Sequence, residues 1–406
     1  MSRSPRILYV TSRWPDAAGT GAHLRSLNLL RGLEQMGSVE VLVLNAENRD
    51  EDLALGRGRW LRHSAAIRVN AQPNSGFVDQ LAWTIDPKRS YPNGWSISEQ
   101  DAQYVRNKAR DFDLVWFYKL VSPDLFPDGS WPSSVVDIDD LPSSYERRTL
   151  KMAGGLGERI LTARRLFTWR RRERLLGDRF SVLSVCSEED KRYLKDLGLA
   201  RPIHVIPNGF DEPLGDWTRA LANPPRIGFV GRLDHEPNRD GIQWFIDHCW
   251  SRIKSVIPNL KLRLVGPGTE LLQDSQLDIE SLGWLPSVTE EMKTWSVMVV
   301  PIRLGAGTCV KVAHGFSQRC PIVSTSLGAR GYDCLHEREM YSADSPEMFA
   351  SACVELVRDL DKAQPLAERA WDYFVEKWSW KSIYPKVWAA AEDCLSQSEA
   401  TASYSV

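Results

Sequence analysis

Short apolar runs alternate along the chain with segments whose apolar residues recur at helical spacing. In the first half, a helix is predicted from Ala22 to Met36 because leucines recur there every three residues, and Gly37 suits its C-terminal cap. Strands are predicted before and after this helix, at residues 6–10, 39–44, 113–118, 134–138 and 180–185. This order of elements is typical of an α/β domain with a parallel sheet.

The same alternation restarts after a turn in the middle of the chain. His204–Asp211 begins with a short apolar run and continues through Pro-Asn-Gly, a turn signal, and polar residues follow as far as Arg226. Further strands are predicted at 226–233, 260–265, 279–285, 297–302 and 322–325, and helices are predicted to begin at Pro346 and Leu366. Two such series in 406 residues predict two α/β domains.

We therefore predict two Rossmann-like domains. Residues 1–205 form the N-terminal domain and residues 206–372 form the C-terminal domain. A helix at 373–395 and a tail at 396–406 complete the prediction, whereas residues 47–110 are hard to interpret.

Composition narrows the class of protein. A net charge of −2 gives no reason to expect a nucleic-acid partner. The seven cysteines are scattered and lack C-x-x-C or Cys/His ligand spacing, which favours a reducing compartment. No apolar run reaches the roughly 18 residues needed to span a bilayer, and no signal peptide precedes Arg6. We expect a cytoplasmic protein.

The segment 299–333 is the strongest candidate for chemistry. An apolar run enters the small-residue turn 305–308, a helical segment follows at 310–317, and a β-branched run begins after Pro321. A glycine turn at the start of a helix lets backbone N–H groups approach a phosphate, and Lys311 adds a positive charge. Gly231-Arg232 forms a second glycine turn with a cation. Such turns are common, but the pair suggests two cations converging on one diphosphate.

The N-terminal loop carries glycines without the tight dinucleotide-binding pattern. Gly19 and Gly21 either let the loop approach a ligand closely or only permit a tight turn. His23 follows them and is a candidate for contact with an acceptor or a donor, although a lone histidine is more often packed or solvated.

An acidic group follows the strand predicted at 134–138. Residues at the carboxyl end of a parallel strand lie on the ligand-binding edge of an open α/β sheet. Asp137 and Asp139 can bind a divalent metal that bridges a diphosphate. Alternatively, Asp139 and Asp140 hydrogen-bond a sugar or an acceptor, or cap the next helix. These alternatives remain open on residue patterns alone.

Residues 147–179 are strongly basic. Leucines and Trp169 interleave with the arginines, as in an amphipathic helix that lies on an anionic membrane surface. A solvated helix face with a few core contacts explains the same pattern. Peripheral contact with the inner face of a membrane is thus one of two interpretations.

The motifs taken together resemble the family 4 glycosyltransferases. The matching pieces run in order over most of residues 5–392, and only as a set are they specific: R-I-L-Y-V-T (6–11) with its Gly19/Gly21 loop, V-I-P-N-G-F-D (205–211), F-V-G-R-L (229–233), L-V-G-P-G (264–268), L-G-W-L-P (282–286) and G-A-G-T-C-V-K-V (305–312). The resemblance implies the GT-B fold, in which two Rossmann-like domains face each other across a cleft.

The resemblance also implies a function. It is retaining, hexosyltransferase-type transfer of a sugar from a nucleotide-diphosphate sugar to a hydroxyl of a glycan, lipid-linked or small-molecule acceptor, as in glycan biosynthesis. The N-terminal domain would hold the acceptor and the C-terminal domain the donor. Members resembling this chain are usually metal-independent, so no cofactor and no metal are expected.

Site residues follow from the same motif match. Catalytic roles are expected for Arg232, Lys311 and Asp139. The remaining expectations cover phosphate or donor contact (Gly19, Gly21, Gly231, Gly307, Thr308, Cys309, Val310), nucleoside contact (Gly266, Trp284, Leu285, His314) and the acceptor side (His23, Asp140).

Three departures from the family pattern bear on function. Ala306 and His314 stand where the family often has two glutamates, of which the second usually contacts the ribose. Asp139 takes the place of a histidine that precedes an aspartate, and Pro237-Asn238 stand where the family frequently has a lysine. Two alternatives stay open. A nucleotide-sugar epimerase or hydrolase has the same architecture and also needs a diphosphate site, and the missing glutamate suits a degenerate, non-catalytic nucleotide-sugar-binding protein.

Overall fold

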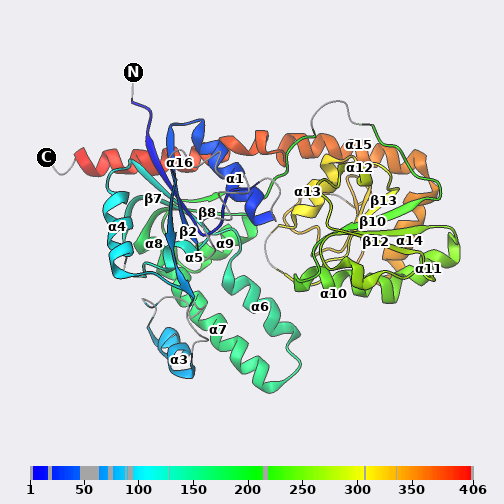
Figure 1. Ribbon diagram of the computed structural model, residues 1–406, viewed down its shortest axis with the longest axis horizontal. Coiled ribbons are helices and arrows are strands. Elements are labelled where there is room, and N and C mark those ends of the chain that lie inside the picture. The colour runs from blue at the N-terminus through cyan, green and yellow to red at the C-terminus, as the bar shows by residue number, and fades with distance from the viewer. Residues whose placement is uncertain are drawn as a thin grey trace. The chain divides into compact units, whose positions relative to one another are not determined.

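The protein is described by a computed structural model, which forms two compact units. The description covers residues 3–16, 21–45, 64–71, 76–86, 89, 95–127, 129–213, 218–305, 308–334 and 336–403. Unit 1 comprises residues 1–207 and 384–406, and unit 2 comprises residues 208–383 (Figure 1). The chain thus begins and ends in unit 1.

Unit 1 is built on a seven-stranded parallel sheet. The strand order is β3-β2-β1-β6-β7-β8-β9. The strands are β1 (Arg6–Thr11), β2 (Ser38–Asn45), β3 (Ser64–Arg68), β6 (Leu114–Tyr118), β7 (Trp131–Asp137), β8 (Phe180–Val185) and β9 (Ile203–Val205). All five residues of β6 are buried, as expected for a parallel strand covered on both faces. A short antiparallel pair, β4 (Asn70–Ala71) with β5 (Trp95–Ser96), stands apart from this sheet.

Helices connect the strands of unit 1, and the last of them follows all strands and belongs to this unit from Tyr384 onward. They are α1 (Gly21–Glu34), α3 (Phe77–Ile85), α4 (Glu99–Ala109), α5 (Val121–Asp124), α6 (Pro142–Met152), α7 (Leu156–Arg174), α8 (Leu176–Arg179), α9 (Glu188–Asp196) and α16 (Trp380–Ser403). The helices α6 and α7 pack against each other and extend beyond the sheet, with α3 beside α7 (Figure 1). Among the described residues, no helix is long and apolar enough to cross a membrane.

Unit 2 carries a six-stranded parallel sheet. Its order is β12-β11-β10-β13-β14-β15. The strands are β10 (Arg226–Val230), β11 (Lys261–Val265), β12 (Ile279–Gly283), β13 (Val297–Val300), β14 (Ile322–Ser324) and β15 (Tyr341–Ser342). The helices are α10 (Glu236–Phe245), η2 (Ile246–Trp250), α11 (Ser251–Val256), η3 (Thr269–Leu272), α12 (Thr289–Met292), α13 (Val310–Ser317), α14 (Pro346–Arg358) and α15 (Leu360–Lys377).

Aromatic packing fixes one face of the second sheet. Trp295 is fully buried, and a Cβ built on Gly228 would lie 1.9 Å from its ring. Glycine at position 228 therefore leaves the space that the indole fills. The neighbouring buried residues Met298, Val312 and Phe316 belong to the same core, so β13 and α13 are held against each other.

The predicted α/β fold class is confirmed, and the deviations are local. Residues 47–110, which resisted interpretation, contain the edge strand β3, helices α3 and α4 and the small β4–β5 pair. Helix α15 begins at Leu360 instead of the predicted Leu366. The prediction placed the helix start after Pro365 because proline usually interrupts a helix, but here Pro365 lies inside α15. The helix predicted at 373–395 is interrupted at Trp378–Ser379 and so divides between α15 and α16.

Candidate functional site

The predicted donor-binding residues of unit 2 lie in loops that follow neighbouring strands. Arg232 follows β10, and Lys311 lies in the first turn of α13, which follows β13. Since β10 and β13 are paired in parallel, their carboxyl ends share one edge of the sheet. This is the edge where open α/β sheets bind ligands.

Asn238 joins these two loops. Its side-chain oxygen accepts a hydrogen bond from Lys311 Nζ at 2.7 Å, and its Nδ2 donates to the carbonyl oxygen of Arg232 at 2.8 Å. The asparagine is buried and lies on α10. A Cβ on Gly231 would come within 2.9 Å of Asn238 Nδ2, so glycine is what allows this close approach. The amide therefore holds Lys311 beside the loop of Arg232.

Arg232 is the more exposed cation in this arrangement. Its guanidinium pairs with the carboxylate of Asp234, with Nε at 2.6 Å from Oδ1, and both side chains are about half exposed or more. The hydrogen bond that Arg232 donates to Asp234 is the main cause that raises the pKa of Arg232. Exposed pairs of this kind contribute little to stability, so an anionic ligand can compete for Arg232 at low energetic cost.

The start of α13 supplies the second half of the candidate phosphate site. Cys309 is the N-cap residue and Val310 begins the helix, whose N-terminal N–H groups favour an anion. The Thr308 hydroxyl is buried and has no hydrogen-bond partner among the described residues. A ligand oxygen would satisfy it. Ala306 and Gly307, also predicted here, lie outside the described residues.

The predicted nucleoside edge lies at the ends of β11 and β12. Gly266 has a φ of +134°, and a Cβ there would lie 2.3 Å from the Gly231 carbonyl oxygen, so only glycine fits. Trp284 is 60% exposed directly after β12, and Leu285 is half-buried against the core of unit 2. An exposed indole at a ligand edge offers a flat stacking surface.

His314 packs against Phe210. The two rings stack with centroids 4.2 Å apart and an interplanar angle of 16°. Burial, followed by the charge of Lys311, lowers the pKa of His314 to about 4. The side chain is therefore neutral at physiological pH. A neutral ring thus occupies the place where the family resemblance implies a carboxylate.

In unit 1, a buried ion pair organises the acidic group. Arg25 of α1 makes a bidentate contact with Asp137 of β7, with Nη2 at 2.6 Å from Oδ1 and Nε at 2.9 Å from Oδ2. Arg25 Nη1 also donates to the Pro207 carbonyl, and Ser184 Oγ donates to Asp137. Asp137 is thereby fully engaged, which matches a structural role better than direct contact with a ligand.

Asp139 and Lys119 stand at the carboxyl ends of β7 and β6. Lys119 Nζ lies 2.8 Å from Asp139 Oδ2, and the Cys186 thiol donates to the other oxygen of Asp139. Both residues have left-handed backbone conformations, with φ of +60° at Lys119 and +61° at Asp139. Non-glycine residues held in this region mark candidate functional positions.

Asp140 is exposed beside this pair. It lines a cavity of about 190 Å³ together with Lys119, Pro142 and Trp169. Desolvation by the surrounding protein and the charge of Asp139 raise the pKa of Asp140. Because the residue itself reaches solvent, water moderates this rise. The cavity makes Asp140 a candidate for contact with an acceptor.

The remaining predicted residues of unit 1 lie at the start of α1. Gly21 begins this helix, and His23 is half-buried in its first turn. Tyr118 Oη donates to the Ala22 carbonyl at 2.7 Å, which ties the helix start to β6. Gly19 lies outside the described residues.

Cations accompany the acidic residues in the described part of the chain. No group of three or more His, Cys, Asp or Glu side chains there is arranged to hold a metal ion. Arg25 and Lys119 approach Asp137 and Asp139, so the carboxylates already have positive partners. The predicted independence from metals stays a prediction.

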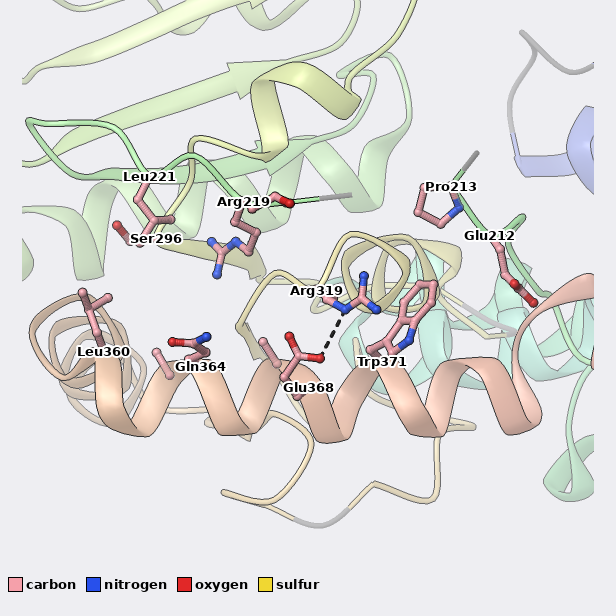
Figure 2. Close-up of a pocket in the computed structure, with 13 residues that line it drawn as sticks. Glu212, Pro213, Arg219, Leu221, Ser296, Arg319, Leu360, Gln364, Glu368 and Trp371 are labelled. Carbon is pink, nitrogen blue, oxygen red and sulfur yellow. Dashed lines mark hydrogen bonds and ion pairs between the residues drawn. The ribbon is translucent and has the colours of Figure 1, made fainter. Parts of the chain in front are cut away.

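A larger cavity of about 820 Å³ lies elsewhere on unit 2 (Figure 2). Its lining includes Ser296 and Arg319, which precede β13 and β14, so it opens at the amino ends of the strands. Arg319 pairs with Glu368 at 3.2 Å and lies over the ring of Trp371 (Figure 2). None of the predicted site residues lines this cavity.

Four contributors to these arrangements were not predicted as site residues. Asn238 was noted only as a departure from the family pattern, and Arg25, Lys119 and Phe210 were not singled out. Lys119 does follow a predicted strand directly, a position that parallel sheets place at the ligand edge. No local pattern identifies Arg25, because its partner lies 112 residues away.

Comparison with known proteins agrees with the architecture. Residues 224–359 match the family model of group 1 glycosyl transferases. Sucrose-phosphate synthase from Thermosynechococcus elongatus is similar in structure, with a TM-score of 0.70 and 15% identity over 97% of this chain and 100% of that one. The fold is therefore GT-B, with two Rossmann-like domains.

Two other similar structures contain ligands. Anabaena Alr3699/HepE, solved with UDP and glucose, has a TM-score of 0.64 and 14% identity, covering 95% of this chain and 98% of that one. The pneumococcal O-GlcNAc transferase GtfA, solved with UDP and GlcNAc, has a TM-score of 0.65 and 10% identity, covering 96% and 99%.

A curated relative matches over a shorter region. It is an uncharacterized 44.6 kDa protein in the cps region of Klebsiella pneumoniae, 21% identical over 170 residues. The match covers 39% of this chain and less than half, 44%, of that protein.

Removing the cation of the buried pair should destabilise unit 1. Arg25→Met leaves Asp137 charged and buried, so we expect a loss of about 3–5 kcal/mol in the free energy of unfolding. Arg25→Met/Asp137→Leu should recover part of it. Urea denaturation measures both, with Arg106→Met, which removes an exposed ion pair, as a control expected to cost less than about 1 kcal/mol. A double variant no more stable than Arg25→Met would contradict the assigned pairing.

The partly buried imidazole of His314 should make unit 2 sensitive to acid. Because the pKa of His314 is about 4 when folded and near 6.5 when unfolded, the unfolded chain binds more protons between these values. The stability that comes from keeping His314 neutral is present above about pH 6.5 and falls as pH drops toward 4. The stability difference between the wild type and His314→Gln, measured by urea denaturation, should therefore shift against the wild type by up to about 1.4 kcal/mol per pH unit. A difference that is constant from pH 7 to pH 4.5 would refute the shift.

Proposed function

We propose that this protein is a glycosyltransferase that transfers a sugar from a nucleotide-diphosphate sugar to a hydroxyl acceptor, with retention at the anomeric carbon. The observation that carries the proposal is the pairing of two cation-bearing loops through Asn238, at the carboxyl edge of a sheet. Both loops fall within the residues that match the group 1 glycosyl transferase family model.

In this proposal, unit 2 binds the donor. Lys311 and Arg232 hold the diphosphate, and the Thr308 hydroxyl and the first N–H groups of α13 complete the contacts to its oxygens. Lys311 acts as a compact charge held by Asn238, whereas Arg232 leaves Asp234 to make a bidentate contact with phosphate. The nucleoside lies along Gly266, Trp284 and Leu285, and UDP is the nucleotide found in two similar structures.

The chemical contribution of these residues is electrostatic. When the bond between the sugar and the diphosphate breaks, negative charge develops on the leaving oxygen. Fixed cations and N–H dipoles aimed at that oxygen stabilise the charge without reorganising during the reaction. His314, neutral and stacked on Phe210, offers hydrogen bonds to a ribose where a carboxylate would offer charge.

Unit 1 contributes the acceptor side in this proposal. Asp139 is fixed by Lys119 and Cys186, and Asp140 lies beside the small cavity at the same sheet edge. Carboxylates there can accept hydrogen bonds from sugar hydroxyls. Hexose as the transferred sugar, and a glycan, lipid-linked or small-molecule acceptor, remain part of the proposal.

Replacing Lys311 tests the donor site. We expect thermal stabilisation of the wild type by one of UDP, GDP, ADP or TDP, and turnover of the corresponding nucleotide sugar with a matching acceptor. Lys311→Ala should lower turnover by roughly 10²–10³, because it removes one fixed positive charge that stabilises the leaving diphosphate. Proton NMR of the product checks that the donor's anomeric configuration is kept.

The controls separate this function from others of the same fold. Lys377→Ala, an exposed lysine on α15, should leave binding and turnover unchanged. Unaltered kinetics in Lys311→Ala would refute the role of that residue. Release or conversion of the donor without acceptor would instead indicate a hydrolase or an epimerase. Nucleotide binding with no turnover over a broad acceptor panel would indicate a non-catalytic binding protein.

A further inference from the structure

Helix α7 presents an apolar stripe to solvent. Leu156, Ile160 and Phe167 are 78%, 61% and 64% exposed, and Ala163 between them is exposed as well. At 3.6 residues per turn, positions 156, 160, 163 and 167 fall on one side of the helix. The stripe therefore continues over three turns without a polar interruption.

The buried side chains of α7 are polar. Thr162, Thr168, Arg172 and Glu173 are buried. Glu173 accepts hydrogen bonds from the Ser143 amide and hydroxyl, and Arg172 pairs with Asp124. This is the reverse of the usual arrangement, in which a surface helix buries its apolar face. The inward polar contacts fix the helix with its apolar residues outward.

Arginines border the stripe. Arg159, Arg170, Arg171 and Arg174 are exposed, and the helical angles place them beside or at the end of the apolar residues. The only acidic residues of α7 are Glu158, which lies on the other side of the helix, and the buried Glu173. The charge along this face is thus positive throughout.

Helix α3 widens the apolar surface. It packs on α7 through Trp83, whose ring meets Trp169 at 5.3 Å, and through a hydrogen bond from Arg164 to Gln80. Val78, Leu81 and Ile85 of α3 are 76%, 42% and 63% exposed. Within the described residues, both helices therefore leave large apolar side chains exposed to solvent.

We propose that α7, with α3 beside it, docks this protein on an anionic lipid membrane surface. The stripe of Leu156, Ile160 and Phe167 would enter the boundary between headgroups and acyl chains, and the bordering arginines would bind lipid phosphates. The positive charge of these arginines complements the negative charge of an anionic lipid surface, which favours a membrane as the binding partner. A second copy of the same face would bring two rows of arginines together, and the like charges would repel. The proposal is independent of the transferase function.

Vesicle co-sedimentation of the full chain tests the proposal. We expect binding to vesicles of phosphatidylcholine and phosphatidylglycerol at about 7:3, with at least tenfold weaker binding to phosphatidylcholine alone and a marked loss when salt rises from 0.1 M to 0.5 M. Ile160→Ser/Phe167→Ser and Arg159→Gln/Arg170→Gln/Arg174→Gln should each weaken binding at least tenfold. All five positions are exposed, so circular dichroism and thermal unfolding should match those of the wild type.

A matched control lies on the other unit. Leu271 is 87% exposed in η3, and Leu271→Ser should leave vesicle binding unchanged. Absence of binding to both kinds of vesicle, or equal binding by the wild type and the α7 variants, overturns the proposal. Sedimentation velocity that shows a dimer dissociated by Ile160→Ser/Phe167→Ser also overturns it, because the stripe would then bind a second copy.

Discussion

The pairing of Arg25 with Asp137 is the constraint on which the ligand edge of unit 1 depends. A fully buried carboxylate and guanidinium are tolerated only when each meets the other with good geometry. Here the two side chains come from α1 and β7, and Ser184 of β8 and the Pro207 carbonyl take up further hydrogen-bonding groups. This network fixes where α1 begins and how β7 ends. The positions of His23, Asp139 and Asp140 follow from it.

Unit 2 is organised by packing more than by charge. Trp295 fills the space left by Gly228, and β13 and α13 are held together around it. The cations at the carboxyl edge are attached to this rigid base by short turns. A hydrophobic core thus positions polar groups whose own interactions are weak and partly exposed, such as the Arg232–Asp234 pair. This division leaves the phosphate-binding groups available to a ligand.

Sequence patterns predicted the fold class well because parallel strands and their helices leave strong local signals. The strand Phe180–Val185 and the helix Val310–Ser317 were predicted to the residue. Residues 47–110 gave no such signal, since their elements are short and partly exposed. The site was harder: Lys311 and Arg232 carry turn signals, whereas Arg25 and Asn238 act through partners far along the chain. For α7 the sequence indicated a basic segment with interleaved apolar residues, but not which of these residues face solvent, because sequence does not show which side of a helix is buried.

The amide of Asn238 has a consequence for the charge of the donor site. It fixes the Lys311 ammonium by a hydrogen bond, as a carboxylate would, yet it brings no negative charge. An aspartate at this position has nearly the same shape, but it would form a salt bridge with Lys311 and neutralise its charge. With asparagine at position 238, Lys311 is held in place and keeps its full positive charge for an anionic ligand. With aspartate, the same ammonium would already be paired with a carboxylate.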